Sequence, residues 1–344
     1  GTHPLTGIDR ALVVGLGASG RASARALSRA GVEVTLVDDD PDHPAAADLR
    51  AQGLHVIDGI PPAEAFDPTI QLVVPSPGVP EHAPVLQIAQ AAGAQIWSEP
   101  ELGIRLYPHR LVAVTGTNGK TSTARMIDAL LRAHGLRTGR FTSPHLESVT
   151  ERICLDGEPV SEERFVAAYA ELEPYLEIVD ARHDVRLSYF EVLVAMAYAT
   201  FADAPVDVAI AEVGLGGSWD ATNVADATVA VVMPISLDHA EYLGDSIEGI
   251  AEEKAGIVKP GSFVVLAEQD DEVAEIVLRR VAEVGAAAAI EGREFGVRRR
   301  DLAVGGQQVT FQGLTGSYDE VIMPLHGAHQ AGNAACAVAA VEAF

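Results

Sequence analysis

Residues 112–122, VAVTGTNGKTS, hold the clearest chemistry in this sequence of 344 residues. An apolar strand pattern runs into a glycine-containing loop, and a helix pattern follows. Glycines let backbone N–H groups turn toward an anion, the start of a helix adds partial positive charge, and a lysine can reach the last phosphates of a nucleotide. We therefore predict a nucleotide-binding loop made of Thr115, Gly116, Thr117, Asn118, Gly119, Lys120, Thr121 and Ser122.

The loop departs from the usual phosphate-binding motif, G-x-x-x-x-G-K-[ST], at one position. Val114 stands where the motif has its first glycine. An ordinary turn between strand and helix is the alternative interpretation. We favour the nucleotide loop because strand, loop, Gly-Lys-Thr and helix follow one another in the order that phosphate binding requires.

Three further polar residues have weaker patterns of their own. Glu212 follows a very apolar strand pattern, and α/β proteins place ligands at the carboxyl ends of parallel strands. A carboxylate in that place is a suitable Mg²⁺ ligand. His239, after the next strand pattern, resembles an ordinary loop histidine when taken alone, and Lys254 a solvated helix lysine.

A second glycine motif lies near the start of the sequence. Gly15, Gly17 and Gly20 form a complete G-x-G-x-x-G that contains Ser19, and Asp38 ends the next strand pattern. By spacing alone this motif predicts a dinucleotide site. An NAD-binding oxidoreductase is therefore one hypothesis, although no His/Arg or Tyr/Lys arrangement for hydride transfer stands out.

Strand and helix patterns alternate through most of the chain, which predicts an α/β protein with parallel sheets. Residues 11–99 form one such series and residues 111–236 begin another, with a boundary near 107–110. Residues 299–312 are expected to form antiparallel hairpin strands, and residues 327–344 an alanine-rich helix. The predicted fold is a Rossmann-like parallel sheet followed by a second, nucleotide-binding α/β unit.

Composition limits the classes of partner. The net charge of −25 argues against nucleic acid or an anionic membrane. No apolar run reaches the roughly 18–20 residues of a membrane helix, and the first residues show no secretory signal. The two cysteines, Cys154 and Cys336, cannot build a disulfide framework, so a cytoplasmic location is expected. Small molecules are the expected partners, and a monomer is the expected state.

The stretch TGTNGKTS resembles the phosphate loop of the Mur ligase superfamily, which includes folylpolyglutamate synthase. Further blocks resemble the folate branch over residues 111–344. They are FTSPHLESVTERI (141–153), SYFEVLVAMAY (188–198), AEVGLGGSWDATNV (211–224), PISLDHAEYLGDSIEGIAEEKAGIVK (234–259) and HGAHQAGNAA (326–335). The resemblance implies a P-loop NTPase-type Mur ligase central domain that uses ATP and Mg²⁺ to join glutamate to a carboxylate through an acyl phosphate.

The resemblance also implies roles for single residues. Magnesium is held in folylpolyglutamate synthases by residues that match Ser143, Glu212 and His239. Lys254 matches the lysine that CO₂ carbamylates in these ligases and would act with Lys120 and His239 in catalysis and with the metal. Glu191 is expected to support Lys254 or a metal. His329, Gln330 and Asn333 match the stretch that contacts adenine in the family. The alternative interpretation of these residues is an ordinary helix start.

The first segment resembles a different branch of the superfamily. LVVGLGASGRASARALSRAGVEVTLVDDD (12–40), VVPSPGVP (73–80) and SEPELGIRL (98–106) resemble the first domain of UDP-N-acetylmuramoyl-L-alanine:D-glutamate ligase. That resemblance implies a UDP sugar, with uridine near Asp38 and pyrophosphate over Gly15, Gly17, Ser19 and Gly20. The chain thus resembles a hybrid, which could be an engineered chimera, a natural fusion or an old branch that retains both traits.

Three domains are expected on this basis. Residues 1–109 would be a Rossmann-like domain of the UDP-binding type, residues 110–325 the ATP-binding central domain, and residues 326–344 the start of a truncated C-terminal domain. The acceptor is left open between a folate-type and a UDP-muramoyl-type carboxylate. A catalytically incomplete chimera that only binds nucleotide is the alternative to an active ligase.

Overall fold

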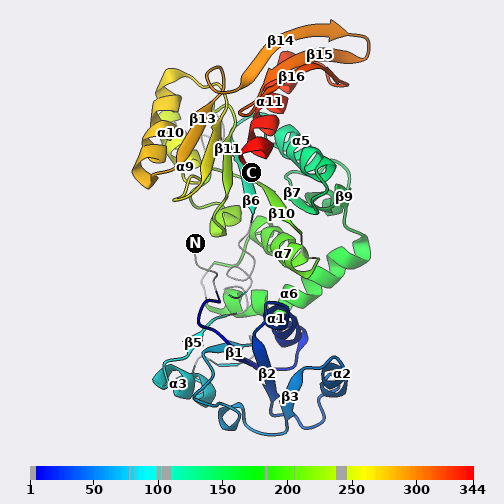
Figure 1. Cartoon of the computed structure of the whole chain (residues 1–344), viewed down its shortest axis with the longest axis vertical. Coiled ribbons are helices and arrows are strands. Elements are labelled where there is room, and N and C mark those ends of the chain that lie inside the picture. Colours follow the sequence, from blue (N-terminus) through cyan, green and yellow to red (C-terminus); the bar gives the residue numbers. More distant parts are fainter. Residues whose placement is uncertain are drawn as a thin grey trace. The chain divides into compact units, whose positions relative to one another are not determined.

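The computed structural model describes residues 5–76, 79–80, 82–98, 102, 110–182, 185–204, 206–237 and 246–344. The chain divides into two compact units, Gly1–Pro108 and His109–Phe344 (Figure 1). Both units are α/β structures built on parallel strands, so the predicted fold class is confirmed. Among the described helices, none is long and apolar enough to cross a membrane.

The first unit contains a five-stranded parallel sheet in the order β3-β2-β1-β4-β5. Its strands are β1 (Arg10–Val14), β2 (Glu33–Asp38), β3 (His55–Asp58), β4 (Leu72–Pro75) and β5 (Gln95–Ile96). Its helices are α1 (Ala18–Arg29), α2 (Ala46–Ala51) and α3 (Pro84–Ala91), with a 3₁₀ turn, η1, over Pro62–Glu64. The strand order reverses between β1 and β4, which is where open α/β sheets bind ligands.

The second unit contains an eight-stranded sheet in the order β13-β12-β11-β6-β10-β7-β8-β9. The parallel strands are β6 (Leu111–Thr115), β7 (Thr138–Phe141), β10 (Val208–Glu212), β11 (Val229–Val232), β12 (Phe263–Leu266) and β13 (Ala287–Ile290). Two antiparallel strands, β8 (Ile153–Leu155) and β9 (Glu158–Pro159), extend the sheet beyond β7, with β9 at the edge. The helices are α5 (Lys120–Ala133), α6 (Glu162–Arg182), α7 (Tyr189–Asp203), α9 (Ile247–Ala255), α10 (Asp271–Val284) and α11 (Ala328–Ala343), with 3₁₀ turns η2 (Val149–Arg152) and η3 (Ala221–Val224).

A separate antiparallel sheet confirms the predicted hairpin. It consists of β14 (Gly296–Ala303), β15 (Gly306–Gln312) and β16 (Ser317–Met323). The final helix, α11, packs on α5 and buries a row of alanines that includes Ala331, Ala335 and Ala339. The expected domain boundaries at 109/110 and 325/326 stay predictions.

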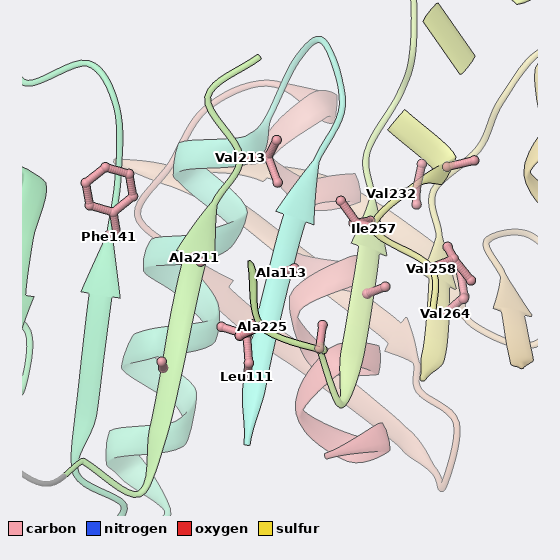
Figure 2. Close-up of a cluster of buried hydrophobic side chains, with 14 of the residues drawn as sticks. Leu111, Ala113, Phe141, Ala211, Val213, Ala225, Val232, Ile257, Val258 and Val264 are labelled. Carbon is pink, nitrogen blue, oxygen red and sulfur yellow. The ribbon is translucent and has the colours of Figure 1, made fainter. Parts of the chain in front are cut away.

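Alternate residues of the central strand β6 enter two hydrophobic cores. Leu111 and Ala113 belong to the core that α7, α9 and α10 cover, part of which Figure 2 shows. Val112 and Val114 belong to the core on the opposite face, under α5 and α11. All of β6 is buried, as expected for the middle strand of a parallel sheet. This burial fixes the strand end from which the phosphate loop departs.

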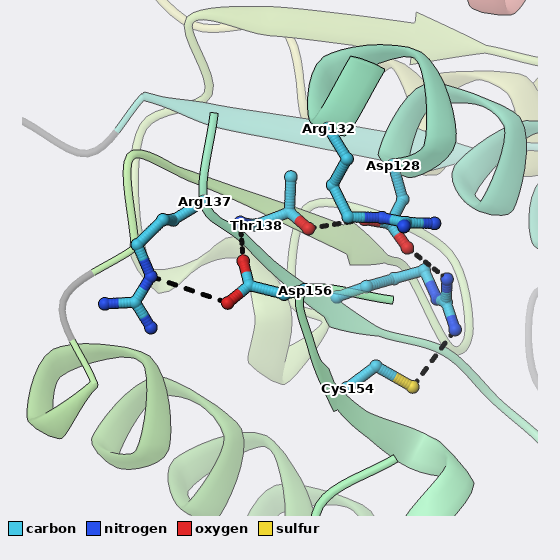
Figure 3. Close-up of polar contacts among 7 residues, drawn as sticks. Asp128, Arg132, Arg137, Thr138, Cys154 and Asp156 are labelled. Carbon is cyan, nitrogen blue, oxygen red and sulfur yellow. Dashed lines mark hydrogen bonds and ion pairs between the residues drawn. The ribbon is translucent and has the colours of Figure 1, made fainter. Parts of the chain in front are cut away.

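A buried polar cluster joins α5 to the neighbouring strand β7 (Figure 3). The Asp128 carboxylate forms an ion pair with Arg140 and accepts a hydrogen bond from the Thr138 hydroxyl at 2.5 Å. Arg140 also contacts the Cys154 sulfur at 3.0 Å, and burial raises the pKa of that thiol. A buried ion pair contributes little net stability, because desolvation offsets its attraction, but breaking one partner is costly. The cluster therefore constrains how α5 sits along β7.

Candidate functional site

The phosphate loop leaves β6 and enters α5 through two glycines that no other residue could replace without movement. A Cβ atom on Gly116 would lie 2.6 Å from the Met233 Cβ, and one on Gly119 would lie 2.4 Å from the Asn333 Oδ1. Both glycines also have positive φ angles, of 135° and 86°. Val114 is a buried strand residue paired with Glu212, so the loop begins after it and needs no glycine there.

Neighbouring segments hold this loop rigidly. The Thr115 hydroxyl donates to the Gly216 carbonyl at 2.8 Å. The Thr117 N–H donates to the Pro234 carbonyl at 2.9 Å, and the Thr117 hydroxyl donates to the Ser236 carbonyl at 3.0 Å. A loop fixed in this way does not need to reorganise when a phosphate binds, which favours binding.

Two lysines from different helices meet at one carbonyl of the loop. The Lys120 ammonium donates to the Gly116 carbonyl at 2.8 Å, and the Lys254 ammonium donates to the same oxygen at 3.3 Å. Lys254 is only 4% exposed, so it is not the solvated helix lysine that its position alone suggests. The structure thus brings both predicted lysines to the phosphate loop.

Glu212 lies at the carboxyl end of β10, beside the first turn of α5. Its carboxylate accepts hydrogen bonds from the Thr121 hydroxyl at 2.8 and 2.9 Å and from the Ser143 N–H at 3.3 Å. The residue is 1% exposed, and this burial raises the pKa of the Glu212 carboxyl, although the Thr121 hydrogen bond and the Lys120 charge oppose the shift. Three predicted residues, Glu212, Ser143 and Thr121, therefore converge.

This group supplies oxygen atoms that suit magnesium. Carboxylate and hydroxyl oxygens are hard ligands, and Mg²⁺ usually takes one or two carboxylates together with substrate phosphates. In the described part of the chain, no three His, Cys, Asp or Glu residues gather into a metal cluster. His239, the third predicted ligand, lies outside the described residues. The donor set thus fits a magnesium ion that is completed by phosphate oxygens.

A cavity of about 1050 Å³ adjoins the phosphate loop and is lined by the three residues predicted to contact adenine. Its walls include Asn118, Gly119 and Ser122 from the phosphate loop, and His329, Gln330 and Asn333 from the start of α11. The Gln330 amide nitrogen donates to the Ser122 hydroxyl at 3.5 Å, and the Asn333 amide nitrogen donates to the Gln330 oxygen at 3.3 Å. Phosphate loop and predicted base site therefore share one cavity large enough for a nucleotide.

Some site residues were not predicted from the sequence. Glu291 and Arg300 also line the cavity, and burial raises the pKa of Glu291. The Glu253 carboxylate accepts hydrogen bonds from a loop beside the site, at Gly217 (3.1 Å) and Trp219 (3.2 Å). These residues come from segments whose own patterns are ordinary, so nothing local in the sequence marks them.

Glu191, expected to support Lys254 or a metal, makes local hydrogen bonds at the start of α7, and its predicted role stays a prediction. Its carboxylate accepts a hydrogen bond from the Ser188 N–H at 2.7 Å, and its own N–H donates to the Ser188 hydroxyl at 3.3 Å. These reciprocal bonds form a capping box at the start of α7. Hydrogen bonds from Ser188 to the Glu191 carboxylate, first from its side chain and then from its backbone N–H, lower the pKa of Glu191.

The glycine motif of the first unit forms a turn between β1 and α1. Gly15 has a φ of 105°, Gly17 caps α1, and Ser19 and Gly20 lie in its first turn. The Asp38 carboxylate accepts the Leu16 N–H at 2.8 Å. The structure thus brings the five predicted residues of this motif together, with Asp38 bonded to the turn itself.

Comparisons with known proteins match both units. Residues 9–98 match the model of the Mur ligase MurD-like N-terminal domain, and residues 182–341 match the model of the Mur ligase middle domain. Both models describe Mur ligase domains, and they match in the order N-terminal then middle. The comparisons therefore do not support the interpretation of the chain as a hybrid or chimera, nor do they favour an oxidoreductase.

Curated relatives and solved structures resemble the larger part of the chain. The dihydrofolate synthase/folylpolyglutamate synthase of Mycobacterium tuberculosis is 51% identical over 253 residues, which are 70% of this chain and 52% of that protein. The folylpolyglutamate synthase of Lacticaseibacillus casei is 37% identical over 236 residues, covering 68% of this chain and 55% of its own. The chain thus spans about half the length of these relatives.

Two solved structures share the fold. The M. tuberculosis folylpolyglutamate synthase complexed with ADP gives a TM-score of 0.67 at 52% identity, over 69% of this chain and 54% of that one. A structure described as an FPGS-AMPPCP-folate complex gives a TM-score of 0.66 at 37% identity, over 68% of this chain and 58% of that one.

Proposed function

We propose that the chain, whose residues 9–98 and 182–341 match models of Mur ligase domains, takes part in ATP-dependent amide formation and joins glutamate to a folate-type carboxylate. The observation that carries this proposal is the convergence of Lys120, Lys254 and Glu212 on the phosphate loop, beside a cavity of about 1050 Å³. Relatives named as folylpolyglutamate synthases, including one structure with ADP and one with AMPPCP and folate, support the choice of substrates.

In the proposed reaction, an oxygen of the acceptor carboxylate attacks the γ-phosphorus of ATP, so that an acyl phosphate forms and ADP leaves. The amine of glutamate then attacks the acyl carbon, loses a proton and displaces phosphate. Backbone N–H groups of the loop and the Lys120 ammonium offset the charge of the phosphates in the first step. Glu212, Thr121 and Ser143 would hold magnesium, which neutralises phosphate charge when bound.

Lys254 is proposed to carry a carbamate. Its buried ammonium shares the Gly116 carbonyl with the half-buried ammonium of Lys120, and two cations so close together repel each other. The Lys254 ammonium would first lose a proton, and its nitrogen would then bond to the carbon of CO₂ with release of a second proton. This reaction would replace one cation by an anion. Intact-protein mass spectrometry should show a gain of one CO₂ at neutral pH that acid removes and Lys254→Ala lacks; an unmodified mass under CO₂ would contradict it.

The acceptor is tested by calorimetric titration of the chain with Mg-AMPPCP, dihydropteroate and UDP-N-acetylmuramoyl-alanine, each alone. We expect the nucleotide and dihydropteroate to bind. The MurD-like match over residues 9–98 favours a second candidate, a UDP-muramoyl acceptor, which binding of the UDP sugar in place of dihydropteroate would support. Absence of nucleotide binding would overturn the proposal. A cytoplasmic location and a monomeric state stay predictions.

A further inference from the structure

One residue of α9 holds the loop of residues 214–220 that follows β10. The Glu253 Oε1 accepts hydrogen bonds from the N–H groups of Gly217 at 3.1 Å and Trp219 at 3.2 Å. The Glu253 carbonyl accepts two more from Ser218, from its N–H at 3.0 Å and its hydroxyl at 3.3 Å. Three consecutive loop residues are thus bonded to Glu253, and bonds to its carboxylate are strengthened by its charge.

The loop and α9 approach so closely that glycine is required on both sides. A Cβ on Gly217 would lie 2.6 Å from the Glu253 carbonyl oxygen, and one on Gly256 would lie 1.8 Å from the Ser218 hydroxyl. Close packing of backbone on backbone leaves little freedom for the loop to shift along the helix. The contact is therefore a fixed joint rather than a loose surface contact.

The contact between α9 and the 214–220 loop is connected to the phosphate loop through two hydrogen bonds. The carbonyl of Gly216, next to the residues that Glu253 binds, accepts the buried Thr115 hydroxyl at 2.8 Å. Lys254, the residue after Glu253, donates from its ammonium to the Gly116 carbonyl at 3.3 Å. Glu253 is therefore connected to Thr115 through the 214–220 loop, and Lys254 is bonded directly to the next residue, Gly116.

We propose that Glu253 is a positioning residue for the nucleotide site. It holds the 214–220 loop against α9, and through Gly216 and Thr115 this contact fixes the phosphate loop relative to Lys254. Glu253 acts through these groups and does not itself touch the substrate. The inference rests on the proposed nucleotide-binding function, because its consequence is measured as nucleotide affinity.

Three variants test it: Glu253→Ala removes both side-chain bonds, Glu253→Gln keeps an acceptor oxygen, and Glu252→Ala is the matched control. Glu252 is the preceding residue on α9 and makes an exposed ion pair with Arg279 at 3.1 Å. Calorimetry should show Mg-AMPPCP binding about tenfold weaker in Glu253→Ala, the range seen when a supporting contact is lost, and close to the unmodified chain in the other two.

Fluorescence anisotropy decay of Trp219 measures the loop without any nucleotide. Trp219 is exposed, whereas the other tryptophan, Trp97, is buried in the first unit and the same in every variant. We expect faster local motion of Trp219 in Glu253→Ala only. Unchanged motion and unchanged affinity in that variant would overturn the proposal, as would equal losses in Glu253→Ala and Glu252→Ala.

Thr115→Val keeps the proposal testable if Glu253→Ala does not fold. This variant removes the Thr115 hydroxyl that donates to the Gly216 carbonyl, and so breaks the hydrogen bond between the phosphate loop and the 214–220 loop. We expect weaker Mg-AMPPCP binding with the motion of Trp219 unchanged, and full affinity would contradict the proposed connection. If the unmodified chain itself did not bind Mg-AMPPCP, the proposed function would fall, while the Trp219 measurement would still decide whether Glu253 holds the loop.

Discussion

The two glycine turns of this chain have the same construction but different surroundings. In each, a parallel strand ends at a turn with a glycine of positive φ, Gly15 at 105° and Gly116 at 135°, and a helix follows. In each, a basic side chain donates to a carbonyl of its own turn: Arg21 Nε to Gly17 at 3.3 Å, and Lys120 Nζ to Gly116 at 2.8 Å.

The difference lies in the groups around each turn. The second turn has Lys254 beside it and a cavity next to it, with Glu212 held by the Thr121 hydroxyl. The first turn has a carboxylate, Asp38, bonded to its Leu16 N–H. A carboxylate so close repels a phosphate that approaches the same N–H group. Glycine spacing thus sets the shape of a turn, while neighbouring charges decide which ligand it favours.

The largest effect is expected from Gly20→Ala in the first turn. The added Cβ would lie 1.9 Å from the Gly15 carbonyl oxygen, so the turn or α1 must move. We expect the first unit to lose about 3 kcal/mol of unfolding free energy, the upper range for overpacking. Gly17→Ala is the matched control, because a Cβ there meets no atom within 4 Å.

Urea unfolding followed by the fluorescence of Trp97, which is buried in the first unit, measures this loss. Calorimetry with Mg-AMPPCP should give the same affinity in both glycine variants, since the nucleotide site is built from the second unit. A weakened nucleotide affinity in Gly20→Ala would show that the two turns do not act separately.

The next effect is a loss of nucleotide affinity in Lys120→Ala. Loss of one charge-assisted contact to phosphate costs about 1.5–3 kcal/mol, which corresponds to roughly 10–150-fold weaker binding of Mg-AMPPCP. Arg21→Ala removes the corresponding cation of the first turn and should leave this affinity unchanged. Circular dichroism should show that both variants fold. Equal affinities for Lys120→Ala and the unmodified chain would refute the nucleotide-loop assignment.

Glu212→Gln tests the acid beside the second turn through pH. Because burial raises the Glu212 pKa, its proton competes with Mg²⁺ at a higher pH than for an ordinary glutamate. The magnesium dependence of AMPPCP binding should therefore weaken as pH falls from neutral toward that pKa. Glu212→Gln should reduce the magnesium dependence at neutral pH by about tenfold and remove its change with pH.

The raised pKa of Glu212 also predicts how the stability of the chain without ligand depends on pH. Magnesium binding should weaken as pH falls, whereas the stability should decrease as pH rises. A carboxyl whose pKa is higher in the folded state favours folding below its ordinary pKa, and this contribution is lost as pH rises through the folded value. Glu212→Gln, which carries no charge to desolvate, should thus unfold at a slightly higher temperature than the unmodified chain at neutral pH. A lower unfolding temperature together with unchanged magnesium dependence would mean that Glu212 is only structural.

Sequence patterns predicted the groups that follow directly from strand ends. Lys120, Thr121 and Glu212 each lie at or just after the carboxyl end of a parallel strand, and adjacent parallel strands bring such ends together. The contacts that hold them could not be predicted in this way. Glu253 meets Gly217 only because two backbones pack closely, and Asp128 meets Arg140 because a helix and a strand place one polar side chain each on the same buried face.

The smallest effect is expected from Asp38→Asn, which weakens the feature that most distinguishes the first turn. The Asp38 carboxylate accepts the Leu16 N–H at 2.8 Å with one oxygen and the Asp40 N–H at 3.0 Å with the other, whereas an asparagine offers one acceptor. Losing one such bond should cost the first unit about 1 kcal/mol in urea unfolding. Since the variant also removes the charge that repels phosphate, inorganic pyrophosphate should bind the first turn more tightly than in the unmodified chain. Weaker pyrophosphate binding would mean that Asp38 supports an anion site by shaping the turn, and that the two turns differ less than their charges imply.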